Sequence, residues 1–346
     1  MSRQSISSLS YPFPEVPAPG TTIEVAPGIR WLSMPLPFKL DHINLWLIDE
    51  EEGGNAGWTV VDTGIGNAET RALWEKILGK RHVKRVVLTH YHPDHAGNAA
   101  WLCERYGADL WTTQGEYLTA HAVRTASAGY TPDAVLAVFR KNGLDEERAA
   151  RMRGPRNRYA DLVPDFPRSY RRIIEGDEIT LGKHRWRAIV GHGHAPEHLS
   201  LYSKELNTVI AGDMLLSTIS TNVSVWSIDP EGDPLRLFLD SVARYRELPE
   251  DVLVLPSHGK PFRGAHRRVE ELQEHHESRL EELVQSLEKP QSAADLLGVL
   301  FRRPLDVHQT FFAMGEAIAH LHYLYYAGRA KRAVGKDGII RYATSG

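Results

Sequence analysis

The sequence predicts an α/β fold, because short apolar segments with the composition of buried strands alternate with longer segments of helical periodicity. Several of the apolar segments are followed directly by residues that can bind metals, and α/β sheets usually carry their sites at the carboxyl ends of strands. The chain has 346 residues, of which 42% are hydrophobic, so it can bury a large core in one large domain or two unequal ones.

Residues 1–21 are predicted to form a polar lead-in, whose four prolines prevent regular strand pairing. No apolar run here has the length of a signal peptide, and no run elsewhere could span a bilayer, so we expect a cytoplasmic protein with no membrane partner. The 41 basic residues nearly balance the 44 acidic ones, which leaves no overall field to attract nucleic acid.

The first regular elements are two strands, predicted over Leu45–Ile48 and Trp58–Val61 and separated by a turn at residues 52–55. An amphipathic helix is predicted over Thr70–Leu78, because its apolar residues fall on one face. The next strand is Val86–Leu88. This order of strand, helix and strand indicates sheets with helices packed outside them.

The segment after this strand carries four metal-capable side chains within six residues: His90, His92, Asp94 and His95. Alternate side chains of a strand share a face, so His90 and His92 can hold one ion between them. Pro93 ends the strand, and a helical pattern that continues to Leu102 turns Asp94 and His95 toward a second point. The alternative, a solvated loop, would leave four crowded polar groups to find separate hydrogen-bond partners.

Three further strands deliver residues of the same kind. Strand 186–190 leads into Gly191-His192-Gly193-His194, strand 209–212 ends at Asp213, and strand 252–255 leads into Ser257-His258-Gly259. Since such residues follow the ends of buried strands, we expect them to meet the first cluster at one rim of the sheets.

Taken in order, these motifs resemble the metallo-β-lactamase-fold hydrolase superfamily. The resemblance covers residues 24–264 and rests on five motifs: Val61-Asp62-Thr63-Gly64, the histidine run, the glycine–histidine segment, Gly212-Asp213 and Ser257-His258-Gly259. It implies an αββα sandwich, with two sheets back to back and helices outside, as a catalytic domain over residues 22–264.

The resemblance also implies a site for two divalent metal ions. The first ion would be held by His90, His92 and His194, the second by Asp94, His95 and His258, and Asp213 would bridge both. Asp62 and His198 are implied to support the ligands without binding metal. Nitrogen and oxygen ligands of this kind favour zinc, with iron or manganese as alternatives.

The third motif departs from the family pattern G-H-T-x-G-H, because it contains three histidines. Aligning the following sequence His-Leu-Ser-Leu-Tyr, which begins at His198, selects His194 as the ligand. His192 is then an extra residue, with either a direct role or a bond to a neighbour. Glu197 stands where the family has glycine, and it could alter the turn or bring a carboxylate near the metals.

The ligand set predicts a hydrolase in which a hydroxide shared by both ions attacks an ester-type carbonyl. Asp94 is the predicted catalytic residue, since it could orient the hydroxide and pass its proton onward. The resemblance favours a small-molecule thioester such as an acyl-CoA, then lactones and other esters, because true β-lactamases of this fold generally lack the bridging Asp213. The alternatives are a metal-dependent ribonuclease or phosphodiesterase, and a non-catalytic metal-binding regulator.

The loop Pro35–His42 is predicted to contact substrate. Its apolar residues and one polar tip suit an acyl chain or an aromatic ester, and Phe38 and His42 are the candidate contacts. Tyr91, which lies between two of the histidines, is a third candidate.

A second segment that could set substrate choice is an insertion over residues 120–170, between the second and third motifs. Helices are predicted within it at residues 132–140 and 146–152. The insertion could form a lid over the metals, or it could only buttress the sandwich.

Residues 265–346 are predicted to form a C-terminal region that resembles a winged helix. The pattern indicates three helices and a β-hairpin, over residues 267–287, 292–301, 309–326, 332–334 and 339–341. Basic residues such as Arg329 and Arg332 would suit nucleic acid, but the third helix is aromatic rather than basic. We therefore expect the region to pack on the catalytic domain or on the second chain of a homodimer.

Overall fold

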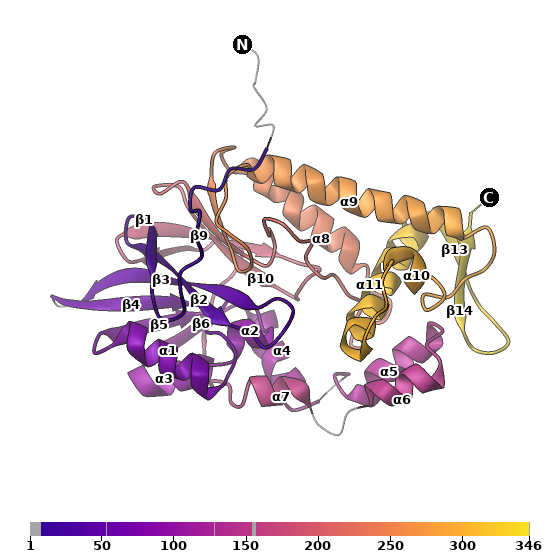
Figure 1. The fold of residues 1–346 in the computed structure, drawn as a ribbon, viewed down its shortest axis with the longest axis horizontal. Helices are drawn as coiled ribbons and strands as arrows, with labels where there is room; N and C mark the ends of the chain where they lie inside the picture. The colour runs from indigo at the N-terminus through magenta and orange to yellow at the C-terminus, as the bar shows by residue number, and fades with distance from the viewer. Residues whose placement is uncertain (1–7, 53, 128, 154–156, 346) are drawn as a thin grey trace, which may run out of the picture. The chain divides into compact units, whose positions relative to one another are not determined.

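The computed structural model describes residues 8–52, 54–127, 129–153 and 157–345, and its larger part consists of two β-sheets with helices (Figure 1). The first sheet has seven strands: β1 (Ile23–Ala26), β2 (Ile29–Pro35), β3 (His42–Glu52), β4 (Asn55–Val61), β5 (His82–Val87), β6 (Asp109–Thr112) and β7 (Arg171–Arg172). They lie in this order across the sheet. Strands β1 to β4 pair antiparallel, whereas β4 to β7 pair parallel. The predicted α/β class is confirmed.

The second sheet has five strands, in the order β12 (Leu253–Pro256), β11 (Thr208–Gly212), β10 (His198–Ser203), β9 (His184–Gly191) and β8 (Glu178–Leu181). Only β11 and β12 pair parallel. Trp31 and Trp46 from the first sheet and Trp186 from the second lie in one buried hydrophobic cluster. The two sheets therefore pack face to face, as in the predicted sandwich.

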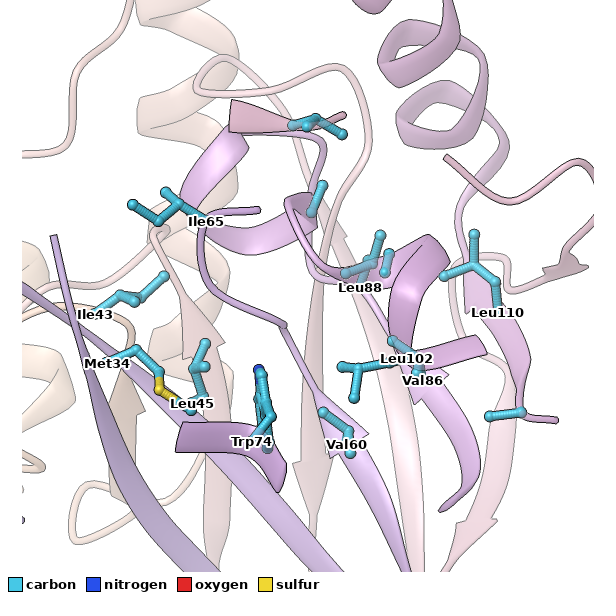
Figure 2. Packing of buried hydrophobic residues seen from close by; sticks show 14 of the residues in the cluster. Met34, Ile43, Leu45, Val60, Ile65, Trp74, Val86, Leu88, Leu102 and Leu110 are labelled. Atoms are coloured by element: carbon cyan, nitrogen blue, oxygen red, sulfur yellow. The ribbon is translucent and has the colours of Figure 1, made fainter. Parts of the chain in front are cut away.

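The other face of the first sheet is covered by α1 (Ala68–Leu78) and α3 (Ala99–Tyr106). Figure 2 shows Leu45, Val60 and Val86 from the strands in one cluster with Trp74 and Leu102 from the helices. The N-terminus of α1 is capped by Asn67, whose side chain accepts the N–H of Thr70 at 2.8 Å. The predicted helix over residues 70–78 is confirmed as part of α1.

The helical pattern predicted to run from Asp94 to Leu102 is interrupted, and this prediction was wrong. A single turn, α2 (Pro93–Ala96), is separated from α3 by Gly97 and Asn98. The hydroxyl of Thr63 accepts the N–H of Asn98 at 3.0 Å, and the Asn98 side chain donates to the Ile65 carbonyl at 2.6 Å. These bonds replace continued helix hydrogen bonding.

Contacts divide the chain into two compact units. Unit 1 comprises the residues up to Arg124, residues 158–221 and residues 241–269, and it contains both large sheets. It also holds α4 (Gln114–Arg124), α7 (Arg158–Leu162) and the 3-10 helix η1 (Arg244–Glu247). Unit 2 comprises residues 125–157, residues 222–240 and the chain from residue 270 onward. The middle of the predicted insertion thus groups with the C-terminal region, and its role as a lid stays a prediction.

Unit 2 consists mainly of helices. Its elements are α5 (Pro132–Lys141), α6 (Glu146–Met152), α10 (Leu297–Leu300), α11 (Val307–Tyr326) and the hairpin β13 (Ala330–Val334) and β14 (Ile340–Thr344), while α8 (Pro234–Ala243) and α9 (Ala265–Ser286) have residues in both units. The predicted hairpin and four of the five helices predicted in these regions are confirmed. The helix predicted over residues 292–301 was wrong in its first half, because Asp295 accepts both the N–H and the hydroxyl of Ser292 and forms a turn.

Some predictions concern residues outside the described ranges, namely the first seven residues of the lead-in, residue 53 of the predicted turn, residues 128 and 154–156 of the insertion, and residue 346 of the C-terminal region. From Ser8 onward the lead-in is described, and Ser10 pairs with Arg263 in a short antiparallel bridge. Among the described residues, none of the helices is both long and apolar enough to cross a membrane.

Unit 2 buries a pair of histidines, in which His276 Nδ1 lies 3.2 Å from His320 Nε2. Burial, together with the charge of His320, lowers the pKa of His276 to about 2. Burial likewise lowers the pKa of His320 to about 4. Nearby, burial raises the pKa of Glu316 to about 7. The folded state therefore holds both imidazoles neutral and resists their protonation.

This pair should make the protein sensitive to acid. Both folded-state pKa values lie below the unfolded value of about 6.5, so the stabilisation is present above pH 6.5 and is lost as the pH falls toward 4. Each histidine can contribute a slope of up to about 1.4 kcal/mol per pH unit. Glu316, whose pKa is raised in the folded state, adds stability as the pH falls below 7 and so offsets part of this loss. Urea unfolding of wild type should therefore be compared with that of His276→Phe, which lacks one of the two histidines. A fall in unfolding free energy between pH 7 and pH 5 that is equally steep in both proteins would contradict this account.

Candidate metal centre

Seven predicted residues meet at one end of the two sheets of unit 1. The side chains form two groups, in each of which the donor atoms lie within 4.8 Å of one another: His90, His92, His194 and Asp213, and then Asp94, His95 and His258. His90 and His92 lie in the first histidine loop (residues 89–95), which follows β5. His194 lies in the second histidine loop (residues 192–197), which joins β9 to β10.

The carboxylate of Asp213, directly after β11, faces both groups. Its Oδ2 lies 3.4 Å from Nε2 of His194 and 4.0 Å from Nε2 of His90. Its Oδ1 lies 3.6 Å from Nε2 of both His95 and His258. One carboxylate can therefore serve two cations, each through a different oxygen.

Both groups have the chemistry of a cation site. Nε2 of His90 lies 2.9 Å from Nδ1 of His92 and 3.2 Å from Nε2 of His194. Burial, with the charge of His194, lowers the pKa of His92 to about 3, which keeps its nitrogen lone pair available. Two donor atoms that face the gap between the groups, His95 Nε2 and Asp213 Oδ1, are buried without a hydrogen-bond partner among the described residues. Divalent ions would satisfy such atoms.

The second group carries the charge imbalance that a cation would relieve. Burial opposes protonation of His95, but the carboxylates of Asp62, Asp94 and Asp213 outweigh it and raise the pKa of this imidazole to about 10. Burial likewise opposes ionisation of Asp94, yet His95 and His258 lower its pKa to about 2. A cation among these carboxylates would replace the proton on His95.

Asp62 holds the first histidine loop by hydrogen bonds to Thr89 and His95. Its Oδ1 accepts the N–H of Thr89 at 2.8 Å, and its Oδ2 accepts the Thr89 hydroxyl at 2.7 Å. The same Oδ2 lies 2.8 Å from Nδ1 of His95 and thereby directs Nε2 of that ring toward Asp213. The supporting role that the resemblance implies for Asp62 stays a prediction, and these hydrogen bonds are compatible with it.

His198 supports Asp213 in a similar way. The backbone N–H of Asp213 donates to Nε2 of His198 at 3.1 Å, and the ring is completely buried. Gly212 allows this approach, because a Cβ at this position would lie 2.5 Å from the His198 ring and the backbone has a φ of 55°. His198 therefore contacts Asp213 through the main chain, and its supporting role stays a prediction.

His258 is oriented by residues of β3 that the sequence did not single out for this purpose. Its Nδ1 lies 3.1 Å from the carbonyl oxygen of His42. The side chain of Asn44 donates to the carbonyls of Pro256 and Gly259, at 2.9 and 2.7 Å. No motif marks Asn44, because its partners lie more than two hundred residues away in the chain.

The predicted substrate contacts differ in their surroundings. Phe38 is 41% exposed in the loop between β2 and β3, and the His42 imidazole lies 2.6 Å from the exposed carboxylate of Asp41. Tyr91 is only 4% exposed and packs in the hydrophobic cluster of the first sheet. Its position does not favour a contact with substrate.

The two unusual residues of the third motif stabilise the second histidine loop. Nδ1 of His192 lies 2.6 Å from the Pro196 carbonyl and closes the loop on itself. The Glu197 carboxylate accepts the N–H of Gly115 at 2.7 Å. Sequence reasoning also missed Glu116, which is 1% exposed and whose pKa is raised to about 8 by burial.

The comparisons with known proteins agree with this geometry. The family model of the metallo-β-lactamase superfamily matches residues 39–258, and a model of the metallo-β-lactamase-like C-terminal domain matches residues 280–345. The crystal structure of a β-lactamase domain protein from Burkholderia ambifaria is 48% identical, with a TM-score of 0.91 over 97% of this chain and 98% of that chain.

Two further proteins are similar over most of their length. The crystal structure of a metallo-β-lactamase family protein from Thermus thermophilus is 30% identical, with a TM-score of 0.79 over 93% of this chain and 100% of that one. The probable metallo-hydrolase YqjP of Bacillus subtilis is 25% identical over 304 residues, which are 85% of this chain and 91% of that protein. This chain therefore belongs to the metallo-β-lactamase superfamily, and its membership supports a metallo-hydrolase.

Proposed function

We propose that this protein is a hydrolase that uses two divalent metal ions, with zinc favoured, to cleave an ester-type carbonyl bond. A small-molecule thioester of the acyl-CoA kind is the first substrate class, and lactones are the second. The observation that carries the proposal is the Asp213 carboxylate, whose two oxygens face two separate groups of ligand-type side chains.

The first ion would be held by the group that contains His90, and the second by the group that contains Asp94. When bound, such ions supply an acidified water molecule as nucleophile and polarise the carbonyl oxygen of a substrate. The Asp213 carboxylate would bind both ions, one through each oxygen. Asp62 and His198 would keep His95 and Asp213 in the required orientation through their short hydrogen bonds.

Asp94 is the residue that we propose for proton transfer. Its side chain is 18% exposed, compared with 11% for Asp213 and 3% or less for His95 and His258. Its Oδ2 lies 3.4 Å from Nε2 of His258. In the proposed reaction this carboxylate takes up the proton that the attacking water releases and delivers it to the leaving group.

Two observations support an acyl substrate. Asp213 belongs to the ligand pattern of the esterase and thioesterase members that this chain resembles, not to that of true β-lactamases. A protein named hydroxyacylglutathione hydrolase from Idiomarina loihiensis is 22% identical over 218 residues, or 63% of this chain and 62% of that protein. Its name denotes a thioester substrate, which supports the same class here.

The proposal is tested by assaying the metal-loaded protein against acyl-CoA thioesters, lactones, aryl esters and phosphodiesters, with Asp94→Ala alongside. We expect thioester or lactone hydrolysis, and a loss of roughly 10²–10⁴-fold in Asp94→Ala. Hydrolysis of phosphodiesters alone, or a variant as active as the wild type, would refute the proposed reaction.

The loop between β2 and β3 should affect substrate binding. Phe38 is the aromatic residue of this loop and is 41% exposed, so Phe38→Ala should raise KM for an acyl substrate by roughly tenfold, with kcat nearly unchanged. His42→Ala should also raise KM, while its carbonyl still orients His258. Steady-state kinetics that are identical to wild type in both variants would remove this loop from the substrate site.

The surroundings of the basic residues in unit 2 do not favour the nuclease alternative. Arg329 forms ion pairs with Glu277 and Glu281, and Arg332 pairs with Glu231. Guanidinium groups that are already paired with carboxylates are less available to phosphates. The winged-helix character of the C-terminal region and a homodimer stay predictions.

A further inference from the structure

One buried carboxylate connects the two histidine loops. Glu116 lies in the first turn of α4 and is 1% exposed. Its Oε2 accepts the N–H of Tyr91 at 2.8 Å, and its Oε1 accepts the N–H of Glu197 at 2.7 Å. Tyr91 stands between His90 and His92 in the first histidine loop, and Glu197 ends the second. Each oxygen of Glu116 thus fixes one loop.

Residues at the start of α4 reinforce the same connection. The hydroxyl of Thr113 donates to the Glu197 carbonyl at 2.7 Å, and the N–H of Gly115 donates to the Glu197 carboxylate at 2.7 Å. A Cβ on Gly115 would lie 2.9 Å from Cγ of Glu197, so glycine provides the room for this contact. The positive end of the helix dipole also favours a carboxylate here. Glu197 therefore ties its loop to α4 by both main chain and side chain.

The first histidine loop is held from its other side as well. The hydroxyl of Tyr159 donates to the carbonyl of Tyr91 at 2.5 Å. Both the N–H and the carbonyl of Tyr91 are therefore hydrogen-bonded. The neighbouring His90 and His92 have little freedom to change their direction. Asp62 contacts the ring of His95, and the Thr89 hydroxyl lies 3.0 Å from Nδ1 of His90 and 3.3 Å from Nδ1 of His95, so these two residues serve both groups. The two N–H groups that Glu116 accepts belong instead to Tyr91, between His90 and His92, and to Glu197, in the loop of His194. The connection through Glu116 thus acts on the first group of ligands.

We propose that Glu116 is a positioning residue, which holds the two histidine loops at the separation at which His90, His92 and His194 can bind one metal ion. The role deepens the proposed function, since it takes the first group to be a metal site. Among the described residues, the hydrogen bonds of the Glu116 side chain go to the backbone N–H groups of Tyr91 and Glu197 and not to the donor atoms of the proposed ligands. Glu116 acts on both histidine loops through hydrogen bonds to their backbone N–H groups.

Variants that keep only one of the two ligand groups complete allow the positioning role of Glu116 to be measured without an activity assay. His258→Ala removes a ligand of the second group and leaves the first group complete, whereas His92→Ala does the reverse. Glu116→Gln keeps one acceptor oxygen but turns an NH₂ group toward the second N–H. Zn²⁺ affinity is then measured for each protein by competition with a chromophoric chelator, with and without Glu116→Gln.

In the His258→Ala background, Glu116→Gln should weaken Zn²⁺ binding by roughly 10- to 100-fold. In the His92→Ala background, the same change should leave Zn²⁺ affinity unaltered. Unchanged affinity in the first background, or an equal loss in both, would overturn the positioning role. Glu104→Gln, an exposed residue of α3, is the matched control and should change neither affinity.

Thr113→Val keeps the test decisive if Glu116→Gln fails to fold. This substitution preserves the shape of the side chain and removes only the hydrogen bond to Glu197, so it should weaken the same site by roughly three- to tenfold. No change in affinity would again contradict the role. Because hydrolysis is not measured, a protein that binds both ions and hydrolyses none of the assayed substrates would refute the proposed function and leave this result standing.

Discussion

Asp213→Ala should prevent this protein from holding two metal ions at once and should lower kcat by at least roughly 10²- to 10³-fold. The reason is geometric. Asp213 is the residue whose oxygens approach both ligand groups, within 3.4 Å of His194 on one side and 3.6 Å of His95 on the other. Alanine would remove a ligand from each group and the negative charge between them.

Metal content and turnover should be measured on the same preparations, by elemental analysis after dialysis and by hydrolysis of the best substrate. Asp109→Ala is a suitable control, since Asp109 is an exposed residue at the start of β6. We expect two ions per chain in wild type and control, and at most one in Asp213→Ala. Two ions with wild-type turnover in Asp213→Ala would show that the carboxylate does not bridge.

Trp74→Ala should lower the free energy of unfolding by about 3–5 kcal/mol, the range found for large aromatic residues in cores. Trp74 is completely buried between α1 and the first sheet, in the cluster that Figure 2 shows. Its indole N–H also donates to the carbonyl of Thr63 at 2.8 Å. The variant would lose packing and leave the Thr63 carbonyl with the longer bond from the Asn98 side chain, at 3.2 Å, in place of two donors.

Denaturant unfolding of metal-free protein measures this effect without a contribution from ion binding. Trp74→Phe provides the comparison, because it keeps most of the packing but removes the hydrogen bond, and it should cost about 1–2 kcal/mol. If Trp74→Ala lost less stability than Trp74→Phe, the core would not depend on this side chain as described.

The candidate site could be predicted from the sequence because its ligands are marked locally. Each metal-capable residue follows a buried strand, and the spacing of His90, His92, Asp94 and His95 is unusual without a metal. The structure brings all seven residues together. Three helices could also be predicted from the sequence, since α1 and α5 have apolar faces and α1, α5 and α6 begin at side-chain caps.

The features that could not be predicted from the sequence depend mainly on contacts between residues that are distant in the chain. Glu116 reads as an ordinary acidic residue in the first turn of a helix, yet its partner Glu197 lies 81 positions later. Asn44 reaches Pro256 across 212 positions. The turn at Ser292 and the break at Asn98 arose because side-chain hydrogen bonds competed with helix formation, which hydrophobic periodicity does not register.

The central claim is that two ions bind at one end of the two sheets, one in each ligand group. Crystals of the zinc-loaded protein, measured on both sides of the zinc absorption edge, test it most directly. We predict two anomalous peaks, one among His90, His92 and His194 and one among Asp94, His95 and His258, with Asp213 contacting both. A single peak, or zinc only at other positions, would contradict the account.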